Sequence, residues 1–215
     1  ASSRPKGVVL SHSSFCSYVT SNIPPADPDP RSVEKTILAV PLYHVAGMQS
    51  LIAGIFGGRT QIFQEQFKPE HWLWLVQSLG VNRAMLVPTM LQALISLDIF
   101  DNFDLSSLRV VTYGASVMPV DLLEKVMAKL PGAQFINAFG QTETAATITM
   151  LSPEDHVLHG GAKEVAQKRR RLRSIGKPLP DIEIRIVDEY GSDVEIGIVG
   201  EIVAKGQRLM NGYWK

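Results

Sequence analysis

The sequence predicts an α/β fold: a mostly parallel sheet flanked by helices, followed by the start of a β-rich unit. Between residues 36 and 138, short β-branched apolar runs alternate with segments of helical spacing. Beyond about residue 175, the pattern changes to a period of two with glycines between the runs. Short, nearly continuous apolar strands that alternate with helices are typical of parallel sheets covered on both faces.

Five strands are expected in the first part: Thr36–Val40, Thr60–Phe63, Ala84–Val87, Arg109–Tyr113 and Gln134–Ala138. The segments between them have helical spacing: Gly47–Phe56, Pro69–Leu79, Thr89–Leu97 and Pro119–Leu130. Pro69 and Pro119 suit a first helical turn, and Gly80 and Gly132 follow the expected helix ends. The proline-rich stretch Ile23–Arg31 cannot form a helix or a central strand, so we expect a surface loop there.

The last third of the chain has a different character. The polar stretch Ser152–Arg173 contains the basic run Lys168–Arg173, and because like charges repel we expect a solvated, mobile loop; contact with phosphates is the alternative. Ile182–Val187 and Gly200–Ala204 alternate with period two, which predicts antiparallel strands. We therefore divide the chain into an α/β domain over residues 1–175 and the start of a β-rich unit over 176–215.

Composition excludes several classes of protein. The 215 residues hold 21 Lys plus Arg and 21 Asp plus Glu, with 45% hydrophobic residues, which is unlike a disordered chain or a dedicated nucleic-acid binder. The one cysteine, Cys16, allows no internal disulfide and suits the reducing cytoplasm. Because no run reaches about 18 apolar residues, we expect no membrane span.

The segment Phe139–Thr144 directly follows the expected strand Gln134–Ala138. Ligands bind at the carboxyl ends of parallel strands. There Phe139 could stack on a purine, Thr142 could donate a hydrogen bond to a phosphate, and Glu143 could hold Mg²⁺. A helix N-cap at Thr142, with Glu143 in the first turn, accounts for the same residues without a ligand.

Other segments are less specific by themselves. Hydroxyl groups, Lys6 and a glycine in Ser2–Val8 suit a phosphate-binding loop or an ordinary turn. Tyr113–Ser116 ends one expected strand, and Pro41–Gly47 places His44 just beyond another. A lone histidine in such a place is more often structural than functional. Gly200–Gly206, followed by Gly212 and Tyr213, reads alone as a strand between turns.

Taken together, these motifs resemble the adenylate-forming superfamily, which includes acyl-CoA synthetases, nonribosomal-peptide adenylation domains and firefly luciferase. The matching residues are Pro5-Lys6-Gly7, Phe139-Gly140-Gln141-Thr142-Glu143, Ser174–Pro178, and Gly200-Glu201-Ile202 with Gly206 and Gly212-Tyr213. The resemblance runs along the whole chain, which corresponds to less than half of a usual member. It implies part of the large N-terminal domain of an acyl-CoA synthetase.

The resemblance implies a role for each matching residue. Ser2, Ser3 and Lys6 would belong to the phosphate loop, and His44 would border the acyl and thiol-entry region. Gly114, Ala115 and Ser116 would line the adenine and acyl pockets, while Asn137, Ala138 and Phe139 would hold adenine. Gly140 and Gln141 complete the nucleotide motif, Thr142 would contact the α-phosphate, and Glu143 would bind Mg²⁺.

The resemblance also implies the reaction, in which an acid and ATP form an acyl-adenylate and the acyl group passes to CoA. The expected ligands are ATP, Mg²⁺, CoA and a small carboxylic acid, with no nucleic acid. Ser3 departs from the glycine usual in the family's loop. Nothing after Tyr213 supplies the family's ribose-binding aspartate, hinge or catalytic lysine, so we expect the C-terminal lid domain to be absent and the isolated chain to be inactive.

Two alternatives to a fatty-acid or aryl-acid CoA ligase remain. An amino-acid adenylation domain would need an acidic residue near Pro41–Gly47 to pair with the substrate ammonium, and that stretch holds His44 but no Asp or Glu. A buried ammonium without a partner is costly, which favours a simple acid. The other alternative is a non-catalytic nucleotide-binding remnant.

Overall fold

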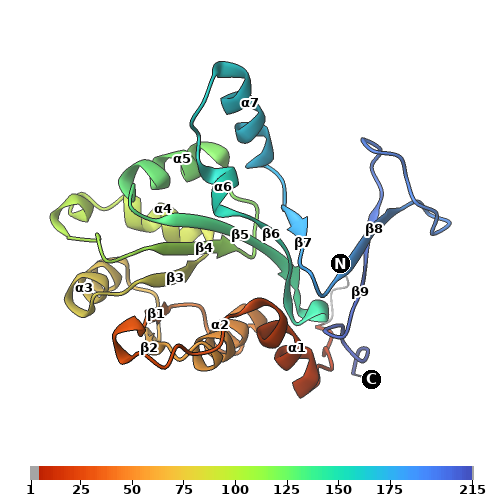
Figure 1. The fold of residues 1–215 in the computed structure, drawn as a ribbon, viewed down its shortest axis with the longest axis horizontal. Helices are drawn as coiled ribbons and strands as arrows, with labels where there is room; N and C mark the ends of the chain where they lie inside the picture. Colours follow the sequence, from red (N-terminus) through yellow and green to blue (C-terminus); the bar gives the residue numbers. More distant parts are fainter. Residues whose placement is uncertain (1–4, 215) are drawn as a thin grey trace.

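The computed structural model describes residues 5–214 and confirms a mostly parallel sheet flanked by helices (Figure 1). The sheet has seven strands in the order β2-β1-β3-β4-β5-β6-β7. Their bounds are β1 Lys35–Leu38, β2 Thr60–Phe63, β3 Arg83–Leu86, β4 Val110–Gly114, β5 Gln134–Gln141, β6 Ala146–Leu151 and β7 Lys177–Pro178. Strands β1 to β5 pair in parallel, whereas β6 and β7 add antiparallel pairings at one edge.

Helices cover both faces of this sheet (Figure 1). On one face lie α3 Pro69–Leu79, α4 Pro88–Ile95 and α5 Val120–Lys129, and on the other lie α1 His12–Asn22 and α2 Val45–Phe56. The main core forms where α3, α4 and α5 meet the sheet, with Trp72, Val111 and Leu123 fully buried. Within residues 5–214, every helix is too short or too polar to cross a lipid bilayer.

The ends of α3 are as the sequence predicts. Pro69 opens the helix, where its missing N–H removes no helical hydrogen bond. Gly80 closes the helix in the left-handed conformation, with φ of 62°, which glycine adopts without a Cβ clash. Helix α5 begins one residue later than the sequence predicts, at Val120, because Pro119 is its N-cap and not its first residue.

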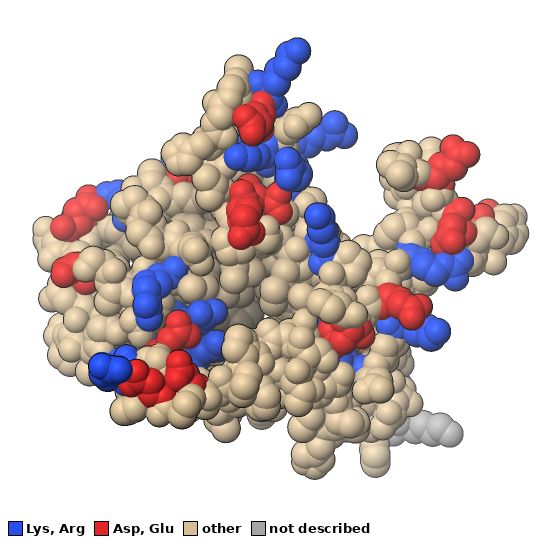
Figure 2. Space-filling view, in the orientation of Figure 1, with Lys and Arg blue, Asp and Glu red and all other residues tan. Residues whose placement is uncertain are grey.

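The prediction of a mobile loop over Ser152–Arg173 is wrong. The segment folds into α6 Pro153–His156 and α7 Ala162–Arg171, and Leu172 at the end of α7 is 2% exposed. Carboxylates on neighbouring elements offset the basic run: Arg169 pairs with Glu124 at 2.5 Å, and Arg171 with Asp155 at 2.8 Å. Figure 2 shows Lys and Arg side chains gathered over this region with acidic side chains beside them.

After β7 the chain leaves the main sheet and forms a separate two-stranded antiparallel sheet. Its strands are β8 Glu183–Val187 and β9 Glu201–Lys205, close to the ranges expected from the period-two pattern. The buried Arg208, which follows β9, pairs with Asp181 at 2.7 Å and donates a hydrogen bond to the carbonyl of Thr147 in β6. The C-terminal segment is therefore bound to the main sheet.

Residues 5–214 also contain three short 3₁₀ turns: η1 Pro30–Ser32, η2 Phe100–Asn102 and η3 Thr142–Thr144.

Candidate functional site

The candidate site is built where β5 turns back into β6. The sequence predicted that this strand ends at Ala138, but β5 continues to Gln141. Phe139 and Gly140 therefore lie inside the strand and do not follow it. The pairing with β6 shifts register between Phe139 and Gly140. A Cβ on Gly140 would lie 1.7 Å from the carbonyl oxygen of Ala146, so glycine is required here by the close approach of two strands.

The turn between the two strands holds Thr142 and Glu143. It is the 3₁₀ turn η3, and its N-cap is Gln141, not Thr142. The Thr144 hydroxyl is placed to donate a hydrogen bond to the carbonyl oxygens of Gln141 and Ala146, at 3.0 and 2.7 Å, and so closes the turn. Ala145 and Ala146 follow with φ of 50° and 89°. Positive φ in residues other than glycine is strained, and such strain concentrates at functional sites.

A cavity of about 190 Å³ opens beside this turn and brings together residues from four parts of the chain. Of the residues singled out from the sequence, it is lined by His44, Ala115, Ala138, Gly140, Gln141, Thr142 and Glu143, and Val45, Ala46, Met85, Ala146 and Thr147 complete the lining. Gly114, Ser116, Asn137 and Phe139 lie nearby in sequence but outside this lining. Ser2 and Ser3 lie outside the described residues.

His44 is the N-cap of α2. Its Nδ1 accepts a hydrogen bond from the Ala46 N–H at 3.2 Å, so in the neutral ring the proton is on Nε2. The residue is exposed and it also lines the cavity. His44 therefore has a structural role, as the cap of α2, and this role leaves its Nε2 available to a ligand.

The end of β4 forms the opposite wall. A Cβ on Gly114 would lie 2.1 Å from the carbonyl oxygen of Ala138, so this glycine allows β4 and β5 to pack closely. Ala115 follows with φ of 66°, a third strained residue at the same end of the sheet. On β5, the Asn137 side-chain amide donates to the Ser174 carbonyl at 3.3 Å and links the strand to the segment before β7.

Tyr213 belongs to this site, although the sequence motifs assigned it no role of its own. The Tyr213 hydroxyl donates a hydrogen bond to Glu143 Oε1 at 2.9 Å, and this bond raises the pKa of Tyr213. Lys6 Nζ lies 4.9 Å from the centroid of the Tyr213 ring. The Gly212-Tyr213 pair was a signal for it, but only the fold places residues 6, 143 and 213 together.

The donor set fits a magnesium–nucleotide complex. Residues 5–214 contain no cluster of three or more His, Cys, Asp or Glu side chains that could enclose a metal ion. Mg²⁺ is usually held by one or two carboxylates together with phosphate oxygens and water. The Glu143 carboxylate meets that requirement, while the Thr142 hydroxyl beside it and the Lys6 ammonium, which lies outside the cavity lining, are groups that could contact phosphate oxygens.

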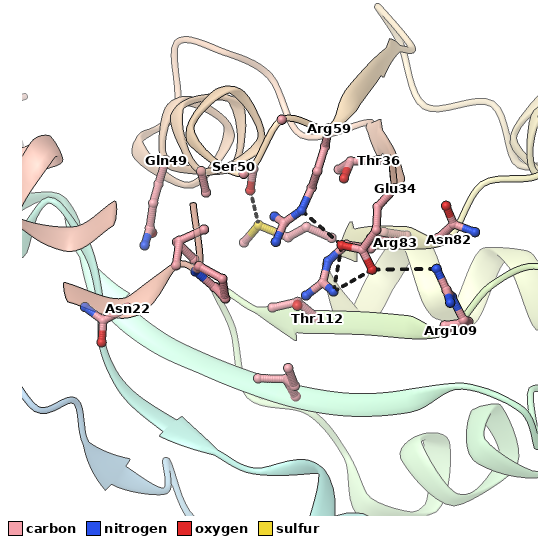
Figure 3. A pocket seen from close by; sticks show the side chains of 18 of the residues that line it. Asn22, Glu34, Thr36, Gln49, Ser50, Arg59, Asn82, Arg83, Arg109 and Thr112 are labelled. Carbon is pink, nitrogen blue, oxygen red and sulfur yellow. Dashed lines mark hydrogen bonds and ion pairs between the residues drawn. The ribbon is translucent and has the colours of Figure 1, made fainter. Parts of the chain in front are cut away.

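A larger hollow of about 840 Å³ lies over the sheet beside α1 and α2. In Figure 3, Arg59, Arg83 and Arg109 converge on the Glu34 carboxylate. Their closest approaches to Glu34 are 3.2, 3.3 and 3.9 Å. None of these residues lines the cavity at Thr142 and Glu143, so the cluster is separate from the candidate site.

Comparison with known proteins agrees with this geometry. Residues 2–214 match the family model described as AMP-binding enzyme. This chain belongs to that family. The AMP-binding chain is 28% identical over 98% of its length to indoleacetate–CoA ligase of Aromatoleum aromaticum, and 32% identical over 98% to a medium/long-chain-fatty-acid–CoA ligase of Mycobacterium tuberculosis.

Solved structures of adenylate-forming enzymes have the same fold. The amide bond synthetase McbA from Marinactinospora thermotolerans superposes with a TM-score of 0.82 at 27% identity and 98% coverage of this chain. o-Succinylbenzoate CoA synthetase from Bacillus subtilis, in complex with ATP and magnesium ion, gives 0.77 at 28% identity and 97% coverage. The chain spans only 34–38% of the two curated relatives and 40% of each of these structures.

Proposed function

We propose that this chain forms the nucleotide- and acyl-binding part of an ATP-dependent acid–CoA ligase. The observation that carries the proposal is the cavity at the end of β5, where Thr142 and Glu143 meet His44 and Ala115. This is the edge of a parallel sheet at which ligands usually bind. The donor set described above is suited to a triphosphate and its metal ion.

The proposed reaction has two steps. A carboxylate is a poor acyl donor, so its oxygen first attacks the α-phosphorus of ATP, which gives an acyl-adenylate and releases pyrophosphate. The thiol of CoA then attacks the acyl carbon and AMP leaves. The protein contributes mainly by positioning the reactants and by stabilising the charge that develops on phosphate oxygens.

The phosphate side of the site has the groups for that task. The Thr142 hydroxyl is exposed at the rim of the cavity, where it can donate to an α-phosphate oxygen. Glu143 would hold Mg²⁺, which when bound neutralises charge on the phosphates. Lys6, together with Ser2 and Ser3, would supply the positive and hydroxyl groups of the phosphate loop.

The proposed adenine side is formed by two strand ends. Gly114 is the last residue of β4, and Ala115 and Ser116 follow it. On β5, directly beside this strand end, lie Asn137, Ala138 and Phe139. The close approach at Gly114 keeps these two segments in contact. Phe139 is partly buried, and its ring is the aromatic group available for stacking on a purine.

The lining of the cavity favours a simple acid over an amino acid. Among the described residues that line it, Glu143 carries the one carboxylate, and that group is hydrogen-bonded to Tyr213. The ammonium of an amino-acid substrate would lack a partner of its own, which is costly in a cavity. A volume of about 190 Å³ is close to the roughly 150 Å³ that accommodates benzene, so we propose that this part of the site holds one ring or a short chain.

A coupled assay tests the proposal. The complete protein that carries this chain should convert aryl acids or short aliphatic acids to CoA thioesters in the presence of ATP and Mg²⁺, with release of AMP. Amino acids, assayed by pyrophosphate exchange, should react more slowly. Exchange with amino acids alone would support the adenylation-domain alternative, and ATP binding without any exchange would support a non-catalytic remnant.

A further inference from the structure

We propose that Tyr213 is a positioning residue that orients the Glu143 carboxylate toward the metal and the nucleotide. The inference rests on the proposed function, and it adds a residue to which no role is assigned above. Its starting point is the hydrogen bond of 2.9 Å from the Tyr213 hydroxyl to Glu143 Oε1.

The backbone around Tyr213 is hydrogen-bonded to the N-terminal segment Gly7–Val9. Asn211 N–H donates to the Val9 carbonyl at 2.9 Å, and Val9 N–H donates to the Gly212 carbonyl at 3.0 Å. Trp214 N–H donates to the Gly7 carbonyl at 2.7 Å. Because these bonds lie on both sides of Tyr213, they hold its backbone in place.

The same segment is tied directly to the turn that carries Glu143. Met210 N–H donates to the backbone carbonyl of Glu143 at 2.8 Å. Gly212 has φ of 132°, a conformation that residues with a side chain rarely adopt. It changes the direction of the chain between Met210, whose N–H bonds Glu143, and Tyr213, whose hydroxyl bonds the Glu143 side chain. The buried Arg208–Asp181 pair holds the start of the segment. The backbone that carries Tyr213 is thus held beside the turn that carries Glu143.

Tyr213 also separates two groups that attract each other. Lys6 Nζ lies over the face of the Tyr213 ring, a favourable cation–π placement. Among the described residues, no ion pair joins Lys6 to Glu143. A direct pair would have to break each time a metal–nucleotide complex bound. The ring keeps the ammonium and the carboxylate apart, and both remain available to the ligand.

The hydrogen bond has a defined effect on the carboxylate. It occupies Oε1 and fixes the rotamer of the Glu143 side chain, so Oε2 is free to meet a cation in one orientation. A carboxylate without this bond would lose rotamer freedom when the cation bound. Tyr213 therefore lowers the entropic cost of metal binding without itself touching the metal.

The test is Tyr213→Phe in the complete protein that carries this chain, with Tyr190→Phe as the matched control. Tyr190 is 84% exposed and lies in the turn after β8, away from the cavity. We expect Tyr213→Phe to weaken the binding of Mn²⁺ with a non-hydrolysable ATP analogue, measured by calorimetry, by about 10-fold. The KM for ATP should rise by a similar factor, while the KM for the acid and the melting temperature stay unchanged. Tyr190→Phe should behave as the wild type.

The double variant Tyr213→Phe/Glu143→Gln decides whether Tyr213 acts through Glu143. In the Glu143→Gln background, Tyr213→Phe should weaken metal–nucleotide binding by less than about 2-fold. Losses that multiply, or a Tyr213→Phe affinity within about 2-fold of the wild type, would overturn the inference. A wild type that binds the metal–nucleotide complex but makes no thioester refutes the proposed function and leaves this test valid. A wild type that does not bind the complex refutes both.

Discussion

At the scale of single residues, Glu143 is the side chain of the candidate site for which the structure gives the sharpest prediction. It lines the cavity, it follows Thr142 in a tight turn, and it accepts a hydrogen bond from the Tyr213 hydroxyl. The side chain is only partly buried, so its charge contributes little to the core. Its removal should therefore affect chemistry far more than stability.

Glu143→Gln in the complete protein is the direct test, because the amide keeps the shape and removes the charge. Adenylate formation should fall on the order of 10²-fold or more. The thioester step from preformed acyl-adenylate, which releases no pyrophosphate, should fall much less. Glu189→Gln, in an exposed turn, is the control. An unchanged adenylation rate with a small drop in melting temperature would leave Glu143 with only a structural role.

His156 predicts a pH dependence of stability. It is buried against Tyr113: Nδ1 donates to the Ser152 carbonyl at 2.7 Å, and Nε2 accepts from the Tyr113 hydroxyl at 2.9 Å. Burial lowers the pKa of His156 from its usual 6.5, an effect that nearby Asp155 partly opposes. The folded state therefore holds the ring neutral, while the unfolded chain gains a proton once the pH falls below about 6.5.

The free energy of unfolding should thus be constant with respect to this group above pH 6.5 and should decrease as the pH falls from there toward the lower folded pKa. Denaturant titrations between pH 5 and 8 would measure the slope. His156→Gln should flatten it, whereas His159→Gln, at an exposed position in the same region, should not. An identical slope in both variants would contradict the assignment.

At the scale of elements, ion pairs decide where the basic segments lie. The run Lys168–Arg173 forms the end of a helix because Glu124 and Asp155 face it and Leu172 is buried beneath it. Glu34 has the same role at the start of β1, where it faces three arginines from other strands and turns. Such partners lie far away in the sequence, so composition alone suggests a mobile loop.

Glu34→Gln tests the second cluster. The amide keeps the size of the side chain but leaves three guanidinium groups close together without their shared carboxylate (Figure 3). Because Glu34 is partly exposed, we expect a loss of about 1–2 kcal/mol in the free energy of unfolding. The loss should shrink at high salt, which screens the repulsion. Glu65→Gln, at an exposed position after β2, is the control, and an equal loss there would rule out a special role for Glu34.

At the scale of the whole molecule, the chain covers the family's nucleotide-binding sheet and only part of the length of its relatives. The fold over residues 5–214 is continuous and has its own core, so we expect the isolated chain to be folded. Its catalytic competence is a separate question. The chain spans only 34–38% of the two curated relatives, so we do not expect it to hold every group that their reaction needs.

The isolated 215-residue chain should therefore form no detectable CoA thioester, because positioning and charge stabilisation supply most of the rate enhancement. The measurement is a single-turnover assay with purified chain, ATP, Mg²⁺ and CoA, beside the complete protein as the positive control. Circular dichroism of the same sample would verify that it is folded. Robust thioester formation by the folded chain would contradict the prediction.

The architecture was predictable from local sequence patterns. Its alternating apolar runs located all five parallel strands and the four helices between them to within about two residues at most boundaries, because local hydrophobic periodicity reflects which face of an element is buried. It also placed Thr142 and Glu143 at a strand end and singled out His44. These features depend on residues close together in the chain.

Local patterns could not predict which of these residues line one cavity, or which contacts hold them there. Strand β6, the helical form of the basic run and the contact of Tyr213 with Glu143 all depend on partners distant in sequence. Hydrogen bonds and ion pairs act over a few ångströms in space, whatever the separation along the chain. The site is therefore a product of the fold, which joins residue 6 to residue 213 and residue 213 to residue 143.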